Sequence, residues 1–133
     1  STWGDKILLC KRAIEPRRGF WTLPAGFLEI GESTSEGAVR ETVEESGAEI
    51  ELKSLFAVFD IPTFNQVHIF YLANMKNSNL CPGTESLEAR LFSESEIPWS
   101  DLSFASVKTA LEIFFEKSNS KVNKVHTALI TYK

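Results

Sequence analysis

"GFLEIGESTSEGAVRETVEESGA", residues 26–48, contains six glutamates in 23 positions. Ser33, followed three residues later by Glu36, is typical of the capping box that begins a helix. Gly47 stands where a helix commonly ends, because glycine adopts the left-handed conformation that closes the last turn. The stretch therefore predicts a loop followed by a helix over residues 34–46.

Three of these glutamates, Glu41, Glu44 and Glu45, project from one side of such a helix, which turns about 100° per residue. Like charges one turn apart cost about 0.2–0.5 kcal/mol, and the helix dipole disfavours anions near the C-terminus. One interpretation is a solvated acidic face, partly offset by Arg40 pairing with Glu44, and composition alone favours it. The other is a cage for hard divalent cations such as Mg²⁺, which take carboxylate oxygens, water and substrate phosphates.

The remaining apolar patterns predict an α/β fold. An amphipathic helix is expected within residues 101–118, and a loop over residues 77–86. Strands are expected at residues 6–10, 49–61, 66–75 and 87–92, and residues 124–133 are expected to be a last strand or a frayed end. Because strands and helices do not alternate regularly, we expect a sandwich built on a mixed β-sheet.

The bulk properties of the chain exclude several classes of protein. Its 133 residues predict a single domain over residues 1–133, and the net charge of −4 predicts neither a nucleic-acid nor a membrane partner. No apolar run is long enough to span a bilayer and no signal peptide opens the chain, so we expect a cytoplasmic protein with Cys10 and Cys81 as reduced thiols. The start lacks Met, and we expect a first strand or an upstream module outside this chain.

The spacing of the charged residues resembles the Nudix box, G-x5-E-x7-R-E-U-x-E-E-x-G-U, where U is a bulky aliphatic residue. The fixed positions are all matched, by Gly26, Glu32, Arg40, Glu41, Glu44, Glu45 and Gly47. Thr42 and Ala48 depart from the pattern at the two U positions. The number of specified residues at fixed spacing makes this signal far stronger than a short motif.

The resemblance implies a Nudix-type α/β/α sandwich with a mixed β-sheet and a nucleotide pyrophosphatase activity that uses Mg²⁺ or Mn²⁺. It assigns the metal to Glu41, Glu44, Glu45 and the backbone carbonyl of Ala25, with one of these glutamates as a base through bound water. Gly26, Glu32, Arg40 and Gly47 would be structural, with Arg40 orienting Glu44 or Glu32. Relatives are often homodimers.

Residues 7 to about 117 look most similar to the FAD and ADP-ribose pyrophosphatase branch, which is related to NADH pyrophosphatases. The Pro-Ala-Gly sequence at residues 24–26 is typical of these enzymes, whereas the S-Q-P-W-P-F-P array of NADH pyrophosphatases is absent from residues 59–66. We expect hydrolysis of FAD or ADP-ribose with release of AMP. The alternatives are NADH or another nucleotide as substrate, a non-catalytic nucleotide sensor, and an acidic domain that binds a protein.

Residues outside the motif are candidates for the substrate. One arginine is expected to meet the diphosphate or the adenosine end of the substrate. Each aromatic ring is a candidate to stack on adenine or flavin, with packing in the core as the more common alternative. Acidic residues before and in the strand at 87–92 are candidates for metal or water binding. His68 and His126 are interpreted as packing or surface residues, not as bases. The candidates are Arg12, Arg17 and Arg18; Phe59, Phe64 and Trp21; and Glu85 and Glu88.

Overall fold

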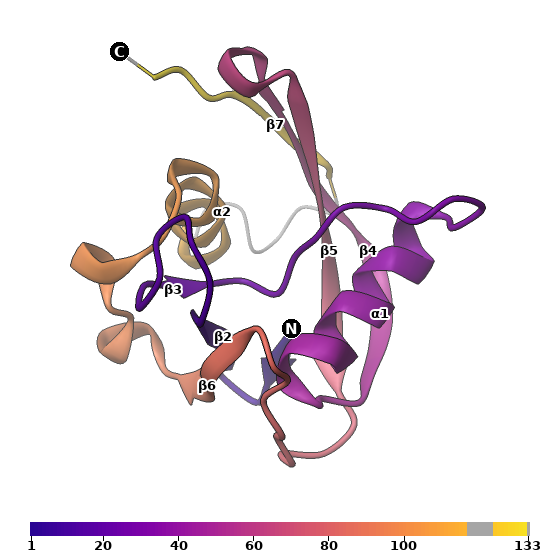
Figure 1. Cartoon of the computed structure of the whole chain (residues 1–133), viewed down its shortest axis with the longest axis vertical. Coiled ribbons are helices and arrows are strands. Elements are labelled where there is room, and N and C mark those ends of the chain that lie inside the picture. Colours follow the sequence, from indigo (N-terminus) through magenta and orange to yellow (C-terminus); the bar gives the residue numbers. More distant parts are fainter. Residues whose placement is uncertain (117–123, 133) are drawn as a thin grey trace.

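The computed structural model of the chain describes residues 1–116 and 124–132. In this part of the chain, one mixed sheet carries a helix on each face, α1 (Thr34–Ser46) and α2 (Ala105–Phe115) (Figure 1). The strands are β1 (Thr2–Trp3), β2 (Lys6–Arg12), β3 (Trp21–Thr22), β4 (Ile50–Ile61), β5 (Gln66–Met75), β6 (Ser86–Phe92) and β7 (His126–Leu129). The predicted α/β/α sandwich is confirmed.

The sheet follows the order β3-β2-β1-β5-β4-β7, and β6 pairs with β2. β4 and β5 form a long antiparallel pair, β2 pairs antiparallel with β6, and β7 runs parallel to β4. This combination of parallel and antiparallel pairs makes the sheet mixed, as the sequence predicted.

The strand β2 supplies side chains to both faces of the sheet, because successive residues of a strand point to opposite sides. Ile7 and Leu9 join the hydrophobic cluster that includes Val107 and Leu111 of α2. Leu8 belongs to a second cluster, against which Val39 of α1 packs. Burial on both faces explains why the segment is an apolar run rather than an alternating one.

The ends of α1 are those predicted. The Ser33 hydroxyl accepts a hydrogen bond from the Glu36 amide at 3.1 Å, and the Glu36 carboxylate accepts one from the Ser33 amide at 3.0 Å. At the other end, Gly47 is left-handed with φ 72° and donates to the Val43 carbonyl. Both signals are local in sequence, which is why the helix was predictable.

Other boundaries differ from those expected. β1 and β3 have two residues each, too few for a periodic pattern. α2 begins at Ala105, because residues 99–101 form a 3₁₀ turn and Leu102 bridges to Trp21. Residues 117 and 118 of the predicted helix, and residue 133 of the predicted last strand, lie outside the described residues.

Short 3₁₀ turns complete the description, at Pro62–Phe64, Glu94–Glu96 and Trp99–Asp101. None of the helices within residues 1–116 and 124–132 is both long and apolar enough to cross a membrane.

Candidate active site

Arg40, in the middle of α1, is the centre of the charged cluster. Its guanidinium donates to both carboxylate oxygens of Glu32, at 2.6 and 2.9 Å. It also donates to Glu41 at 2.7 Å and to Glu44 at 3.1 Å. One cation therefore offsets several of the like charges that the sequence places together, and it contacts both carboxylates named as its possible partners.

The same arginine fixes the loop before the helix. Arg40 donates to the Phe27 carbonyl at 3.1 Å. It also forms an ion pair with Glu29, whose carboxylate oxygen lies 3.3 Å from the Arg40 guanidinium. Glu32 in turn accepts a hydrogen bond from the Glu29 amide at 3.1 Å. The hydrogen bonds from Arg40, and then the bond from the Glu29 amide, lower the pKa of Glu32 to about 2. Glu32 therefore stays ionised and serves to hold the loop.

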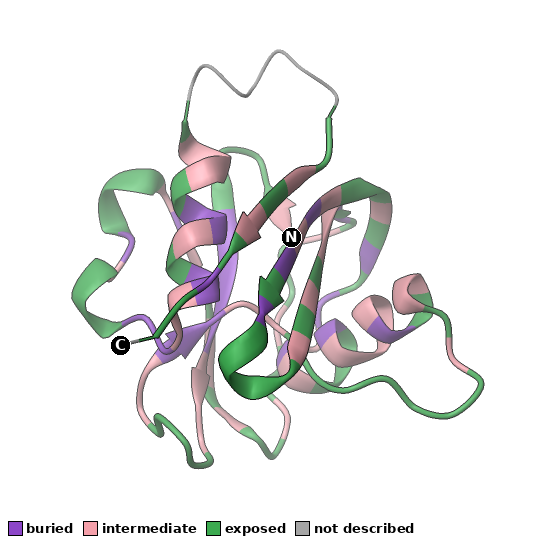
Figure 2. Cartoon of the chain, turned by 90° about the horizontal axis from the view of Figure 1, so that it is seen from above, coloured by how far each residue is buried: buried purple, intermediate pink, exposed green. Residues whose placement is uncertain are grey.

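The loop packs closely against the helix at two glycines. A Cβ at Gly26 would collide with the Glu41 carboxylate. A Cβ at Gly37, on the buried side of α1, would lie 2.6 Å from a methyl of Leu28. Phe27 and Ile30, by contrast, point outward, and the loop projects from the molecule as an exposed segment (Figure 2).

Glu45 is partly buried near the end of α1 and contacts the preceding loop. It accepts a hydrogen bond from the Ala25 amide at 2.8 Å, so the carboxylate is joined to the loop residue just before Gly26. Burial raises the pKa of Glu45 to about 7, and the charges of Glu41 and Glu85 add to this effect. The Ala25 amide and the charge of Arg12 act in the opposite direction. The ionised form is thus unfavourable here without a further positive charge.

The donor set has the chemistry of a site for Mg²⁺ or Mn²⁺. Glu41, Glu44 and Glu45 offer carboxylate oxygens, which hard cations prefer, and a cation would stabilise the ionised form of the partly buried Glu45. Among the described residues, no group of three or more His, Cys, Asp or Glu side chains is arranged so that it could hold a metal ion, so these three carboxylates do not converge on one point. Mg²⁺ in proteins commonly takes only one or two carboxylates, with water and substrate phosphates as its other ligands.

Of the candidate arginines, Arg12 lies beside the site. Its charge acts on Glu45, its Nε donates to the Pro16 carbonyl at 2.8 Å, and its guanidinium lies 5.1 Å from the ring centre of Phe104. Arg17 instead donates to the Ser103 carbonyl at 2.9 Å and stacks on Phe20 at 3.8 Å. Arg17 thus ties its turn to the segment before α2, and Arg18 is exposed.

The aromatic candidates are not gathered at the cluster. Phe59 has no exposed surface and packs in a core cluster with Ala110 of α2, so the prediction that it stacks on a substrate is wrong. Trp21 is buried edge-on against Phe92 at 4.9 Å, and a stacking role is wrong there for the same reason. Phe64 is exposed and lies 5.0 Å from the Tyr132 ring.

The two acidic candidates near β6, Glu85 and Glu88, differ in their relation to the charged cluster. Glu85 lies near enough to Glu45 for its charge to raise the pKa of that carboxyl. Glu88, on β6 opposite Lys11 of β2, is partly exposed and lies 3.9 Å from Arg90. Glu85 therefore belongs to the surroundings of the cluster.

One polar contact was not foreseen from the sequence. Nδ1 of His68 lies 3.0 Å from the Ser106 hydroxyl, and Nε2 lies 3.0 Å from the Gln66 side-chain oxygen. Burial lowers the pKa of His68, so the ring is neutral at pH 7. Ser106 is 2% exposed, so a substrate does not reach the hydroxyl. The histidine joins β5 to α2, which agrees with a packing role.

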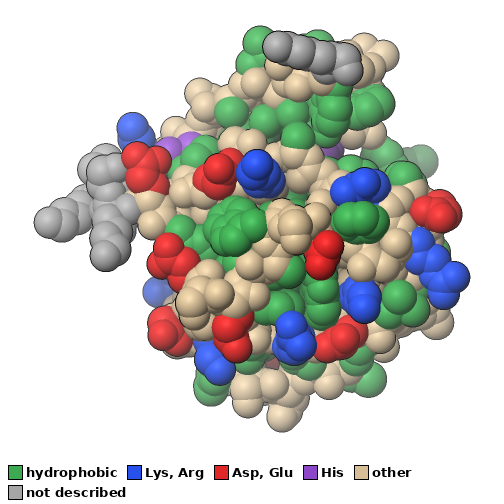
Figure 3. Space-filling model, turned by 90° about the vertical axis from the view of Figure 1, so that its left-hand side faces the viewer, with side chains coloured by type: hydrophobic (Ala, Val, Ile, Leu, Met, Phe, Trp, Pro, Cys, Tyr) green, Lys and Arg blue, Asp and Glu red, His purple; other side chains and the backbone are tan. Residues whose placement is uncertain are grey.

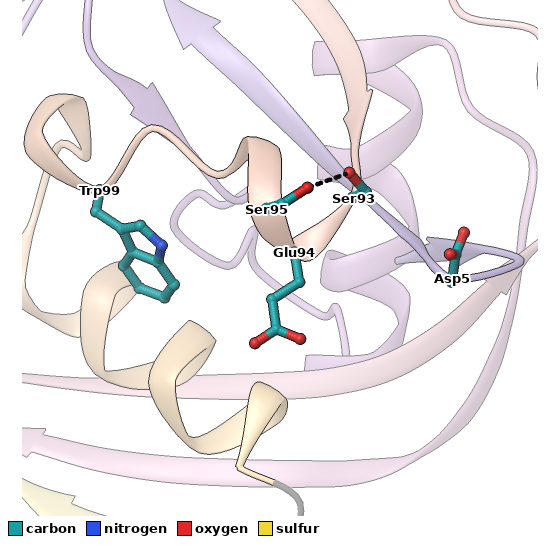
Figure 4. A pocket seen from close by; sticks show the side chains of 5 residues that line it. All are labelled: Asp5, Ser93, Glu94, Ser95 and Trp99. Atoms are coloured by element: carbon teal, nitrogen blue, oxygen red, sulfur yellow. Dashed lines mark hydrogen bonds between the residues drawn. The ribbon is translucent and has the colours of Figure 1, made fainter.

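A shallow hollow away from the motif has a volume of about 510 Å³ and is lined by Asp5, Ser93, Glu94, Ser95 and Trp99 (Figure 4). It opens broadly to solvent. On the face shown in Figure 3, acidic and basic side chains are interspersed, with hydrophobic groups between them. That face therefore offers no broad field of one sign for a polyanion or polycation.

The chain belongs to the Nudix family, because the family model described as "NUDIX domain" matches residues 2–111. It is 35% identical over 98 residues to the "ADP-ribose pyrophosphatase" of Methanocaldococcus jannaschii, covering 71% of this chain and 58% of that protein. It is 34% identical over 95 residues to a "Putative 8-oxo-dGTP diphosphatase" of Bacillus subtilis, covering 71% of this chain and 62% of that protein. The chain thus spans about three fifths of the length of these relatives.

Among solved structures, a "NUDIX hydrolase from Nitrosomonas europaea" is similar over 98% of this chain and 74% of that chain. The identity is 44% and the TM-score is 0.93. The whole described fold, and not only the motif, is therefore that of a Nudix domain.

Proposed function

We propose that this chain hydrolyses the pyrophosphate bond of a nucleoside diphosphate linked to another moiety, in a reaction that depends on Mg²⁺ or Mn²⁺. The observation that carries the proposal is the folded motif itself. Arg40 holds Glu32, Glu41 and Glu44 together, while Glu45 is joined to the loop at Ala25.

The residues divide the work as follows. Glu41, Glu44, Glu45 and the Ala25 carbonyl are the proposed metal ligands, and one of the glutamates takes the proton of the attacking water. When bound, the cation supplies charge that polarises phosphoryl oxygens and lowers the pKa of a bound water. Arg40 fixes the carboxylates of Glu32, Glu41 and Glu44 relative to the loop, through its hydrogen bonds to them and to the Phe27 carbonyl. Arg12 is the arginine proposed to bind a substrate phosphate, and its charge, which acts on Glu45, supports this.

The preferred substrates are FAD and ADP-ribose, with AMP as the common product. Water adds across the bridging P–O–P bond, so ADP-ribose gives AMP and ribose 5-phosphate, and FAD gives AMP and FMN. The relative named as an ADP-ribose pyrophosphatase supports ADP-ribose. The relative named as a putative 8-oxo-dGTP diphosphatase supports the alternative of a nucleoside triphosphate.

Two further alternatives remain as outcomes of the test. One is hydrolysis of NADH, and the other is a domain that binds a nucleotide without turnover. The full set of box glutamates favours an enzyme over the second of these.

The test is chromatographic analysis of products from FAD, ADP-ribose, NADH and a nucleoside triphosphate, each with Mg²⁺, with Mn²⁺ and with EDTA. We expect AMP together with FMN or ribose 5-phosphate, formed only when a metal is present. Turnover of the triphosphate alone would reassign the substrate. Binding of ADP-ribose without turnover in either metal would make the chain a sensor.

A further inference from the structure

The loop that precedes β6 contacts the last turn of α1 through its backbone. The Cys81 amide donates to the Ser46 carbonyl at 2.7 Å, and the Gly83 amide donates to the Glu45 carbonyl at 3.3 Å. The last carbonyls of a helix have no partner within the helix, and other groups must satisfy them. Here a segment more than thirty residues away along the chain supplies two of the donors.

Gly83 sits where no side chain fits. A Cβ at this position would overlap the Glu44 carbonyl oxygen and lie 3.8 Å from the Glu45 Cα. The φ angle of Gly83 is not positive, so another residue could adopt this backbone conformation without strain. Glycine is required because the loop approaches the backbone of Glu44 and Glu45, two of the residues that carry the carboxylates of the cluster.

Two other contacts hold the same turn. A Cβ at Gly47 would lie 2.7 Å from the backbone of Cys81. The contact between the helix end and the loop therefore has a glycine on each side, Gly47 on the helix and Gly83 in the loop. From the sheet, the Cys10 thiol of β2 lies 3.8 Å from the Glu45 carbonyl. The last turn of α1 is therefore held between β2 and the loop at residues 81–83.

We infer that Gly83 is a positioning residue, which sets where Glu44 and Glu45 stand relative to the Ala25 loop and hence the affinity for the divalent cation. The inference rests on the proposed function in one respect, the assignment of these glutamates to the metal. A methyl group at residue 83 would push the last turn away from the loop. Because Glu45 reaches the Ala25 amide at 2.8 Å, a displacement of the turn moves one proposed ligand relative to another.

The test is Gly83→Ala, with Mn²⁺ affinity of the otherwise metal-free protein measured by electron paramagnetic resonance. We expect affinity to fall by about 10–100-fold, the usual effect of disturbing groups that orient metal ligands. For any nucleotide the wild type turns over, kcat should fall far more than KM changes. Restoring turnover at high Mn²⁺ would show that the metal is the missing element.

A matched control separates positioning from loss of stability. Gly4 has φ +62°, and a Cβ there meets no atom within 4 Å, so Gly4→Ala strains the backbone without approaching α1. Gly4→Ala is expected to lower the melting temperature and to bind Mn²⁺ like the wild type. If Gly83→Ala also binds Mn²⁺ within about twofold of the wild type, the inference is overturned.

If Gly83→Ala does not fold, a second pair of variants, at Cys81, tests the inference. Cys81→Pro removes the amide that donates to Ser46, whereas Cys81→Ala keeps it and changes only an exposed side chain. Weaker Mn²⁺ binding in the proline variant alone supports the inference, and equal binding in both contradicts it. If the wild type binds Mn²⁺ but hydrolyses no nucleotide, the proposed function is refuted. The Mn²⁺ affinities of the variants can still be compared with that of the wild type, so the inference about Gly83 is tested separately.

Discussion

Replacing Glu45 with glutamine is expected to stabilise the metal-free protein at neutral and alkaline pH. Burial raises the pKa of this carboxyl from the ordinary 4.5 to about 7, and the carboxylates of Glu41 and Glu85 reinforce the shift. Glutamine has nearly the same shape, carries no charge at any pH, and can still accept the hydrogen bond from the Ala25 amide.

The sign follows from where the proton is held. Below pH 4.5, Glu45 is protonated in both the folded and the unfolded chain. Between pH 4.5 and about 7 the unfolded chain ionises first, so this residue's contribution to the free energy of unfolding falls as pH rises. At about 1.36 kcal/mol per pKa unit the loss is about 3 kcal/mol, reduced to about 2 kcal/mol by solvent screening.

The assay is urea or thermal unfolding in EDTA at several pH values, for the wild type and for Glu45→Gln. The difference in stability should be near zero at pH 4.5 and about 2 kcal/mol in favour of Gln at pH 8, or roughly 5–10 °C in melting temperature. Glu112→Gln, at an exposed site on α2, is the control and should follow the wild type. A Glu45→Gln variant that is no more stable than the wild type at pH 8 would refute the reasoning.

Further predictions concern Mg²⁺ binding, the buried Phe59, the guanidinium of Arg40 and the helix cap at Ser33. Mg²⁺ at one hundred times its dissociation constant should raise the free energy of unfolding by about 2.7 kcal/mol, measured by calorimetry; no shift would exclude binding to the folded state. Phe59→Ala should lose about 3–5 kcal/mol in urea unfolding without changing KM, because the ring is fully buried; a raised KM at unchanged stability would restore the stacking role. Arg40→Lys should lower kcat at least about tenfold, because lysine lacks the planar fork that holds both oxygens of Glu32; steady-state kinetics equal to the wild type would contradict this. Ser33→Ala should cost about 1 kcal/mol in urea unfolding through loss of the cap, and no loss would show that the cap is unimportant.

The parts of the fold that were predictable depend on signals close together in the chain. The limits of α1 follow from Ser33, Glu36 and Gly47, each of which acts within one turn of the helix. The long β4 and β5 strands were also predicted within a residue, because their apolar patterns are extended.

The missed features depend on contacts between distant segments. A phenylalanine in a strand is equally apolar whether its face is covered or open, and only the packing of α2 shows that Phe59 is buried. Arg17 looks like a phosphate ligand in sequence, but it bonds to carbonyls 85 and 86 residues away. Gly83 resembles any turn glycine until the α1 backbone is placed against it.

The catalytic proposal depends on Glu45 more than on any other side chain, since this carboxylate connects the helix to the loop. The most direct measurement is turnover of ADP-ribose at saturating Mg²⁺ by Glu45→Gln, beside the wild type and Glu112→Gln. We predict that Glu45→Gln is folded and at least about a hundredfold slower, while Glu112→Gln equals the wild type. Turnover by Glu45→Gln near the wild-type rate would contradict the assignment of the metal site.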